Sequence, residues 1–264
     1  MVVGFCRGGE RVMVRVLVTR PSGQTAALEG ALHDAGLEPV LVPSIAVTTD
    51  PRGGRLDAAA RVLHTFDWAI VTSANGARAV LKAAERVSTA LDTPRWAALG
   101  HGTAEVLERE GISVEFLPSH ADSRTLAAEV PIRPGQDVVL LRGDLSDDDL
   151  PRMLRERGAE VIDVIAYRTT EAPASSRSML RDALSSDPPA AVLFASGSAV
   201  RGVVALAQAD GLEVTGIPAI CSGSTSAREA SRLGFAAIST APAPDAASLA
   251  ATAAAFLTHP TATR

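Results

Sequence analysis

Four stretches of the chain change in the same way, from a helical pattern of apolar positions to a short run of apolar and β-branched residues. They are residues 31–43, 107–118, 154–165 and 230–240. A glycine separates the two patterns in each stretch: Gly36, Gly111, Gly158 and Gly234. Glycine readily adopts the left-handed backbone that ends many helices. Because the runs that follow are nearly continuously apolar, they are typical of parallel strands covered by helices on both faces. The pattern predicts an α/β fold.

Two kinds of α/β unit alternate along the chain, and each occurs twice. The first kind runs strand, turn, helix, strand, and its copies cover residues 16–45 and 138–167. Arg20 aligns with Arg142 at a spacing of 122 residues. This shared register predicts two similar domains with mostly parallel sheets and right-handed crossovers.

The second kind of unit begins with a strand and a helix at residues 67–84 and again at 190–207. Each copy continues into a second glycine-rich turn, and Gly100 aligns with Gly223 at a spacing of 123 residues. The pattern alone does not say which first unit pairs with which second unit.

The two copies of the first unit both end in an extended, β-branched segment that leads to a proline, at residues 43–51 and 163–173. Two such segments side by side would make a two-stranded β connector between the domains. The expected boundaries are then a discontinuous first domain of residues 1–43 and 171–264, a second domain of residues 49–165, and connectors 44–48 and 166–170.

Composition excludes several classes of protein. Hydrophobic residues make up 47% of the 264, enough for two cores. A net charge of −5 argues against a nucleic-acid partner. No apolar run reaches the ~18 residues that span a bilayer, so no membrane partner is expected. Two cysteines cannot form a disulfide framework, which favours the cytoplasm. We expect a monomer, a frayed segment up to Met13 and a disordered tail from Thr258.

Candidate chemistry lies in the turns that follow the predicted strands, because ligands of open α/β sheets bind there. These turns are rich in glycine and hydroxyl groups: residues 19–22, 72–76, 99–103, 141–144, 195–199 and 222–226. Helices that begin at such turns offer free amides to anions. The simpler interpretation is that Ser73, Asn75, Thr103 and Ser196 only cap helices.

Several familiar sites are missing from the sequence. No phosphate-binding loop with its lysine occurs, and "GHGTAE" lacks the third glycine of a dinucleotide fingerprint. The five histidines are scattered, so no metal is expected. "SDDDL" opens a helix, where acids are favoured, and Ser146 with Asp149 predicts a capping box. The sequence therefore indicates no cofactor.

Tyr167 is the only tyrosine, and it lies in the second extended segment, where the first copy has Ile45. One interpretation is a half-buried aromatic side chain that packs the two connector strands together. The other is a phenol presented to a ligand as a weak acid or hydrogen-bond donor.

The ordered motifs resemble the uroporphyrinogen-III synthase family from Arg15 to Leu257. They include "D.AIVTSANG", "ALGHGTAEVL", "VVLLRG", "IAYRT", "VLFASGSAV" and "CSGSTSA". The resemblance implies two α/β domains joined by a two-stranded ladder, with the first domain assembled from both chain ends. It also implies an enzyme that needs no metal or organic cofactor.

The reaction implied by this resemblance is the cyclisation of hydroxymethylbilane, a linear tetrapyrrole with eight carboxylates. Loss of its terminal hydroxyl gives an electrophile that ring D attacks through a spiro intermediate, and ring D is inverted in uroporphyrinogen III. A cleft between the domains would fold the substrate into one geometry.

The resemblance places a catalytic role on Tyr167, which would help the hydroxyl to leave. The expected substrate-binding residues are Arg20, Ser73, Asn75, Thr103, Arg142, Arg168, Ser196, Ser198, Thr225 and Ser226. One departure from the family pattern is Ala195, which stands where threonine is usual and where the first copy has Thr72.

Two other functions remain open at this point. A non-catalytic module of the same family would bind a tetrapyrrole or another polyanion for regulation. A hinged two-domain binding protein of the periplasmic type is less well supported, because the N-terminus shows no signal peptide.

Overall fold

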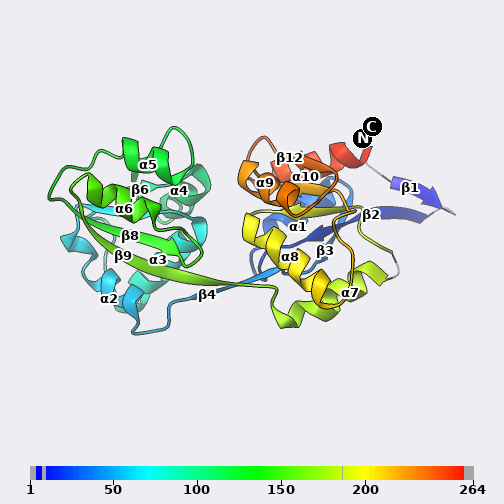
Figure 1. Cartoon of the computed structure of the whole chain (residues 1–264), viewed down its shortest axis with the longest axis horizontal. Coiled ribbons are helices and arrows are strands. Elements are labelled where there is room, and N and C mark those ends of the chain that lie inside the picture. Colours follow the sequence, from blue (N-terminus) through cyan, green and yellow to red (C-terminus); the bar gives the residue numbers. More distant parts are fainter. Residues whose placement is uncertain (1–3, 8–9, 186, 259–264) are drawn as a thin grey trace. The chain divides into compact units, whose positions relative to one another are not determined.

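The computed structural model describes residues 4–7, 10–185 and 187–258. The chain divides into two compact units: unit 1 comprises Met1–Ala46 and Thr170–Arg264, and unit 2 comprises Val47–Thr169 (Figure 1). Each unit has a mostly parallel sheet with helices on both faces, which confirms the predicted fold class.

Unit 1 is built from both ends of the chain. Its first part contains β1 (Gly4–Arg7), β2 (Glu10–Val18), α1 (Ala26–Asp34) and β3 (Leu37–Leu41). Its second part contains a 3-10 turn (Ala174–Ser176), α7 (Arg177–Ser185), β10 (Ala191–Phe194), α8 (Gly197–Ala209), β11 (Ala219–Cys221), α9 (Ser224–Arg232), β12 (Ile238–Thr240) and α10 (Ala246–Thr258). Parallel strands run in the order β3-β2-β10-β11-β12.

Two hydrophobic layers hold unit 1 together. Helices α7, α8 and α9 pack on one side of the sheet, against residues such as Leu17 and Phe194. Helices α1 and α10 pack on the other side, against Val16 and Leu193. Since successive residues of a strand point to opposite faces, β2 and β10 contribute to both layers, and the parts that do so, residues 16–18 of β2 and all of β10, are continuously apolar.

Unit 2 is made of one continuous segment. Its elements are α2 (Arg55–Arg61), a 3-10 turn (Leu63–Thr65), β5 (Trp68–Val71), α3 (Ala74–Val87), β6 (Arg95–Ala98), α4 (His101–Glu108), β7 (Val114–Phe116), α5 (Ser123–Glu129), β8 (Asp137–Gly143) and α6 (Asp149–Glu156). The sheet order is β4-β9-β8-β5-β6-β7, where β4 is Ile45–Thr49 and β9 is Glu160–Glu171. Helices α2, α3 and α4 cover one face, and α5 and α6 cover the other.

The two sheets have the same strand order, once the strands are matched by the repeats. In both, the two strands of the first kind of unit are followed by the three of the second kind: β3-β2-β10-β11-β12 and β9-β8-β5-β6-β7. The four glycines predicted to end helices all have left-handed φ angles, between 76° and 90°. The first copy of the first kind of unit therefore shares a sheet with the second copy of the second kind. The second copy of the first kind shares the other sheet with the first copy of the second kind.

The chain passes between the units within β4 and β9, which are neighbours in the second sheet. In unit 1, the residues next to these strands contact α8. The Ser44 carbonyl accepts a hydrogen bond from the Ala172 amide at 2.9 Å, and Ser44 Oγ donates to the Ala199 carbonyl at 2.8 Å. Ser44 is thus bonded to α8 on one side and to the segment that follows β9 on the other.

Two local predictions were wrong. The capping box at Ser146 does not form, because α6 begins only at Asp149. Arg142 binds the carbonyl oxygens of Ser146 and Asp147, which holds this segment outside the helix. The N-terminal segment is not frayed where it is described, because β1 pairs with the start of β2 in antiparallel register. The expected disorder from Thr258 concerns mostly residues 259–264, which lie outside the described part of the chain.

Candidate functional site

In unit 2, the turns after β5 and β6 bring two helix N-termini to the carboxyl edge of the sheet. Ser73 caps α3, since its Oγ accepts a hydrogen bond from the Gly76 amide at 3.1 Å. Gly100 precedes α4 without a side-chain cap. Asn75 and Thr103 lie inside the first turns of these helices, so neither is an N-cap. Free amides at both turns can bind anions.

The Tyr167 phenol lies at this same edge. Ser73 Oγ donates a hydrogen bond to the Tyr167 hydroxyl at 2.9 Å, although the two residues are 94 positions apart. Because the phenol oxygen accepts this bond, its own hydrogen is available to a ligand. Tyr167 is half-buried, and burial raises its pKa, while the bond from Ser73 acts in the opposite direction. Tyr167 is therefore a neutral donor at physiological pH.

Gly143, which the sequence analysis did not select, makes room for this phenol. It is the last residue of β8 and is opposite Tyr167 on β9, next to an irregularity in the strand register. A Cβ at Gly143 would lie 2.6 Å from Tyr167 Cζ. The available signal was the motif "LRGD" at a strand end, where glycine often marks a close approach.

Arg142, expected to bind substrate, is held by carboxylates of its own unit. Its side chain is 7% exposed, and it donates to both oxygens of Asp163 at 2.8 and 2.7 Å and to Asp148 at 2.6 Å. The Asp163 carboxylate is the main cause of the raised pKa of Arg142. Its contacts give it a role in fixing the loop between β8 and α6.

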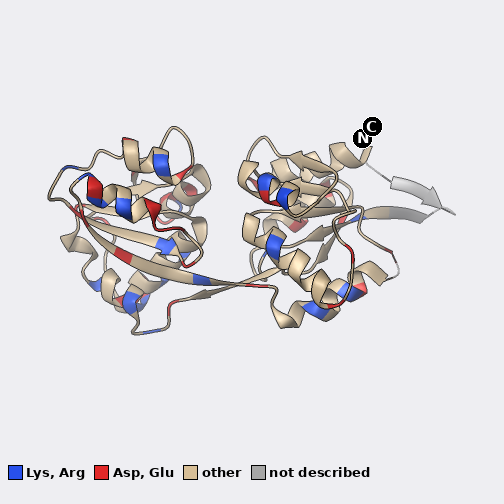
Figure 2. Cartoon of the chain, in the orientation of Figure 1, with Lys and Arg blue, Asp and Glu red and all other residues tan. Residues whose placement is uncertain are grey.

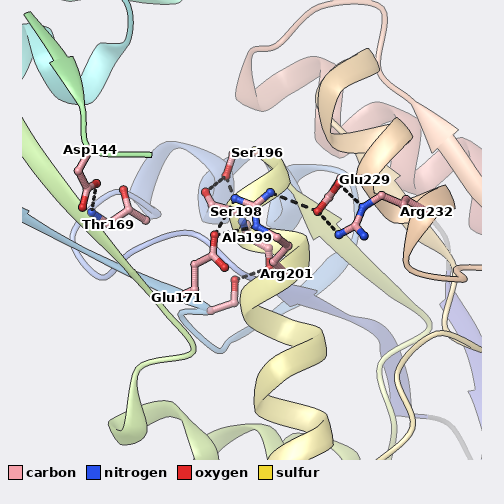
Figure 3. A network of polar contacts seen from close by, with 10 residues as sticks. Asp144, Thr169, Glu171, Ser196, Ser198, Ala199, Arg201, Glu229 and Arg232 are labelled. Atoms are coloured by element: carbon pink, nitrogen blue, oxygen red, sulfur yellow. Dashed lines mark hydrogen bonds and ion pairs between the residues drawn. The ribbon is translucent and has the colours of Figure 1, made fainter. Parts of the chain in front are cut away.

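Arg168 is placed differently from Arg142. Its side chain is 74% exposed, and the nearest Asp144 oxygen is 3.9 Å away. Asp144 in turn accepts a hydrogen bond from the Thr169 amide at 2.9 Å (Figure 3). Arg168 directly follows Tyr167 on β9, so the two side chains leave the strand on opposite faces.

In unit 1, the turns after β10 and β11 carry the corresponding hydroxyls. Ser196 caps α8 by accepting from the Ala199 amide at 3.2 Å, and its Oγ lies 2.9 Å from Ser198 Oγ (Figure 3). Thr225 is exposed on the first turn of α9. Ser226 is buried and donates to the Gly223 carbonyl at 2.9 Å, so it shapes the turn.

The remaining expected residues lie at the ends of strands or in the helix turns that follow them. Arg20 follows β2 in unit 1, and Thr103 is 6% exposed inside α4. The structure thus joins Ser73 to Tyr167 and Ser196 to Ser198 by hydrogen bonds. Asn75 shares its turn with Ser73, Thr225 and Ser226 share another, and Arg142 and Arg168 lie within β8 and β9.

Metal and thiol chemistry find no support in the described residues. No group of three or more histidine, cysteine or carboxylate side chains there could hold a metal ion. Cys221 is buried, and burial raises the pKa of its thiol to about 11. Among the described helices, none has both the length and the apolar character needed to cross a membrane.

Lys and Arg positions are interspersed with Asp and Glu positions along the described parts of both units (Figure 2). A polyanionic ligand would therefore depend largely on helix amides and hydroxyl groups, which carry no formal charge.

Comparison with known proteins identifies relatives of the chain in sequence and in fold. Residues 26–251 match the family described as "Uroporphyrinogen-III synthase HemD". The porphyrin biosynthesis protein HemD of Ruminiclostridium josui is 26% identical over 223 residues, which cover 83% of this chain and 44% of that protein. The uroporphyrinogen-III synthase of Chlorobaculum parvum is 28% identical over 196 residues, which cover 72% of this chain and 77% of that protein.

Solved structures show the same fold. A mutant uroporphyrinogen III synthase from Thermus thermophilus aligns with a TM-score of 0.64 at 20% identity, over 93% of this chain and 100% of that chain. The uroporphyrinogen-III synthetase of Helicobacter pylori aligns with a TM-score of 0.59 at 17% identity, over 92% of this chain and 100% of that chain.

Proposed function

The chain belongs to the uroporphyrinogen-III synthase family, and we propose that it catalyses the reaction for which that family is named. The reaction is a lyase step that converts hydroxymethylbilane into uroporphyrinogen III with inversion of ring D. The observation that carries the proposal is the half-buried Tyr167 phenol, which Ser73 holds at 2.9 Å beside the N-terminus of α3, at the sheet edge that also carries the N-terminus of α4.

Tyr167 acts as the proton donor to the departing hydroxyl. The C–O bond of the hydroxymethyl group breaks, and the phenolic proton leaves with the hydroxyl as water. The bond donated by Ser73 stabilises the developing negative charge on the phenol oxygen. Ring D then attacks through its substituted carbon, and the spiro intermediate fragments and closes again. The proton released when the pyrrole becomes aromatic restores the phenol.

The carboxylates of the substrate are bound by amides and hydroxyls at the strand ends. Asn75 and the free amides of α3 and α4 serve this purpose in unit 2, and Ser196, Ser198 and Thr225 serve it in unit 1. Helix N-termini favour anions through both their amides and their dipoles.

Two of the expected arginines are assigned to the substrate, and one is not. Arg168 is exposed and can pair with a carboxylate, and Arg20 follows the end of β2 in unit 1. Arg142 orders the loop after β8, because Asp163 and Asp148 already occupy its guanidinium. Thr103 and Ser226 act by shaping their turns.

The test supplies the purified chain with enzymatically generated hydroxymethylbilane and separates the uroporphyrinogen isomers. We expect isomer III, formed faster than the spontaneous isomer I. Tyr167→Phe is the matched variant, and it should lower kcat at least about tenfold, since general acids contribute ~10²–10⁴-fold. Isomer I alone, formed at the spontaneous rate, would identify the chain as a non-catalytic binding member of the family instead.

A further inference from the structure

Arg201 on α8 joins three elements of unit 1. Its Nε and Nη2 atoms donate to Glu171 Oε1 at 2.9 and 2.7 Å, and its Nη1 donates to Glu229 Oε1 at 3.2 Å (Figure 3). Glu171 is the last residue of β9, and Glu229 lies on α9. One guanidinium therefore links the end of β9, helix α8 and helix α9.

These ion pairs lie directly beside the turn that carries Ser196 and Ser198. A Cβ at Gly197, the first residue of α8, would lie 3.5 Å from Glu229 Cβ and 3.6 Å from Arg201 Nη1. The first turn of α8 thus rests on the side chains that connect it to α9.

Glu229 can bind Arg201 over a wide pH range, because its carboxylate remains ionised. Its side chain is 16% exposed and also accepts two hydrogen bonds from Arg232, at 2.9 and 2.8 Å. These bonds from Arg232, followed by the bond from Arg201, lower the pKa of Glu229 to about 2. The carboxylate is charged throughout the physiological range.

We propose that Arg201 is a positioning residue, which fixes the first turns of α8 and α9 relative to each other and to the end of β9, so that both turns can bind substrate carboxylates together. This inference rests on the proposed function. It assigns Arg201 no contact with substrate, because its three donor nitrogens already bind Glu171 and Glu229.

Geometry rather than ion-pair energy gives Arg201 this role. The Arg201 side chain is 39% exposed, and exposed ion pairs add only ~1 kcal/mol or less to stability. The planar guanidinium, however, directs its donors at fixed angles, which lysine cannot reproduce. Displacing a group that positions substrate by ~1 Å lowers kcat/KM by up to ~100-fold.

The experiment compares steady-state kinetics of the full chain with three variants. Arg201→Met removes all three donor nitrogens. Arg201→Lys keeps the positive charge but lacks the planar guanidinium with its fixed donor directions. Arg181→Met is the matched control, since it removes another exposed arginine of unit 1, which pairs with Asp210 at 3.0 Å. We expect Arg201→Met to raise KM for hydroxymethylbilane at least about tenfold with kcat within about threefold, because Tyr167 is untouched. Arg201→Lys should be intermediate, and Arg181→Met should match the wild type.

Two results would overturn the proposal: a KM of Arg201→Met equal to that of Arg181→Met, or a loss confined to kcat. If Arg201→Met does not fold, Glu171→Gln and Glu229→Gln each weaken one of the two ion pairs of Arg201. An unchanged KM in both variants would also overturn the proposal.

Crystal structures provide a readout independent of activity. The first turns of α8 and α9 should shift by about 1 Å in Arg201→Met relative to β10 and β11. A wild type that makes only isomer I would refute the proposed function, and the crystal structures would still decide the positioning role: unmoved turns would refute it.

Discussion

Gly143 and Tyr167 face each other across β8 and β9, and the absence of a side chain on the first leaves the space for the second. A Cβ at Gly143 would lie 2.6 Å from Tyr167 Cζ and 2.7 Å from its hydroxyl oxygen. Such distances are too short for any carbon atom, so the ring would have to move.

Gly143→Ala should therefore displace the phenol from Ser73. We expect kcat to fall at least about tenfold, to the level of Tyr167→Phe, with a loss of stability of about 1–3 kcal/mol. The measurement is turnover of hydroxymethylbilane, with folding checked by circular dichroism. In the double variant the two losses should not add, because both remove the same donor. Wild-type kcat in Gly143→Ala would mean that the phenol position is unimportant.

The ionisation of Tyr167 can be followed without interference from other tyrosines, since it is the only tyrosine in the sequence. Burial raises its pKa, so tyrosinate absorbance should appear with a midpoint above the ordinary 10.0. Ser73→Ala should move the midpoint higher still, because the bond from Ser73 lowers the pKa.

The same shift affects stability in a defined direction. The unfolded chain loses its tyrosine proton at a lower pH than the folded chain, so stability should fall as the pH rises above 10.0. A midpoint at or below 10.0, or a downward shift in Ser73→Ala, would contradict the described surroundings of the phenol.

Gly202 permits α8 to touch the chain where it leaves unit 1. A Cβ at Gly202 would overlap the Ser44 carbonyl oxygen and would lie 3.3 Å from the Ala172 amide nitrogen. Gly202→Ala should lower the free energy of unfolding by about 2–4 kcal/mol, as measured by urea denaturation, because backbone rather than a flexible side chain must move.

Gly30→Ala is the control for this prediction. Gly30 lies inside α1 of the same unit, and a Cβ added there would have no atom within 4 Å. Since alanine favours helix by about 0.5–1 kcal/mol over glycine, Gly30→Ala should stabilise the protein. Equal effects of the two substitutions would show that close packing at Gly202 does not matter.

The lowered pKa of Glu229 predicts that the stability of the protein depends on pH in the acidic range. Its pKa is lowered from 4.5 to about 2, so its stabilising contribution is complete above 4.5 and is lost as the pH falls towards 2. Glu229→Gln should cost about 1–2 kcal/mol near neutral pH, and the difference from wild type should shrink in this acidic window. The measurement is the free energy of unfolding of both proteins, obtained by urea denaturation at several pH values between 4.5 and about 2.

Glu156→Gln serves as the comparison for the acid series. Glu156 pairs with Arg152 on the surface of α6, and its side chain is 60% exposed. Its replacement should cost less than about 1 kcal/mol. The difference in the free energy of unfolding between Glu229→Gln and wild type could instead be constant with pH. That result would argue against the ion pairs that join Arg201 and Arg232 to Glu229.

The fold was largely predictable because local patterns repeat. The glycines after α1, α4, α6 and α9 each precede a strand, and this spacing predicts the alternation of helices and strands in both units. The failure at Ser146 shows the limit of such reasoning. The capping motif is local, whereas the Arg142 side chain that overrides it comes from the neighbouring strand β8.

The candidate site was less accessible to sequence reasoning, because its contacts are not local. Tyr167 stands out as the only tyrosine, yet nothing in the sequence pairs it with Ser73, 94 positions away. Arg142 aligns with Arg20, but only tertiary structure places Asp163 beside it. Gly143 matters through a side chain on the adjacent strand. Roles that depend on such long-range neighbours cannot be inferred from spacing alone.

The division of unit 1 between the two ends of the chain has a consequence for biosynthesis. Strands β2 and β3 leave the ribosome early, but β10, which covers the other side of β2, is translated only after all of unit 2. During that interval β2 keeps an unpaired, apolar edge, the kind of surface that recruits foreign strands. Unit 2 can fold while it is being synthesised, whereas unit 1 must wait, so newly made chains depend on protection of β2 until their last third has emerged.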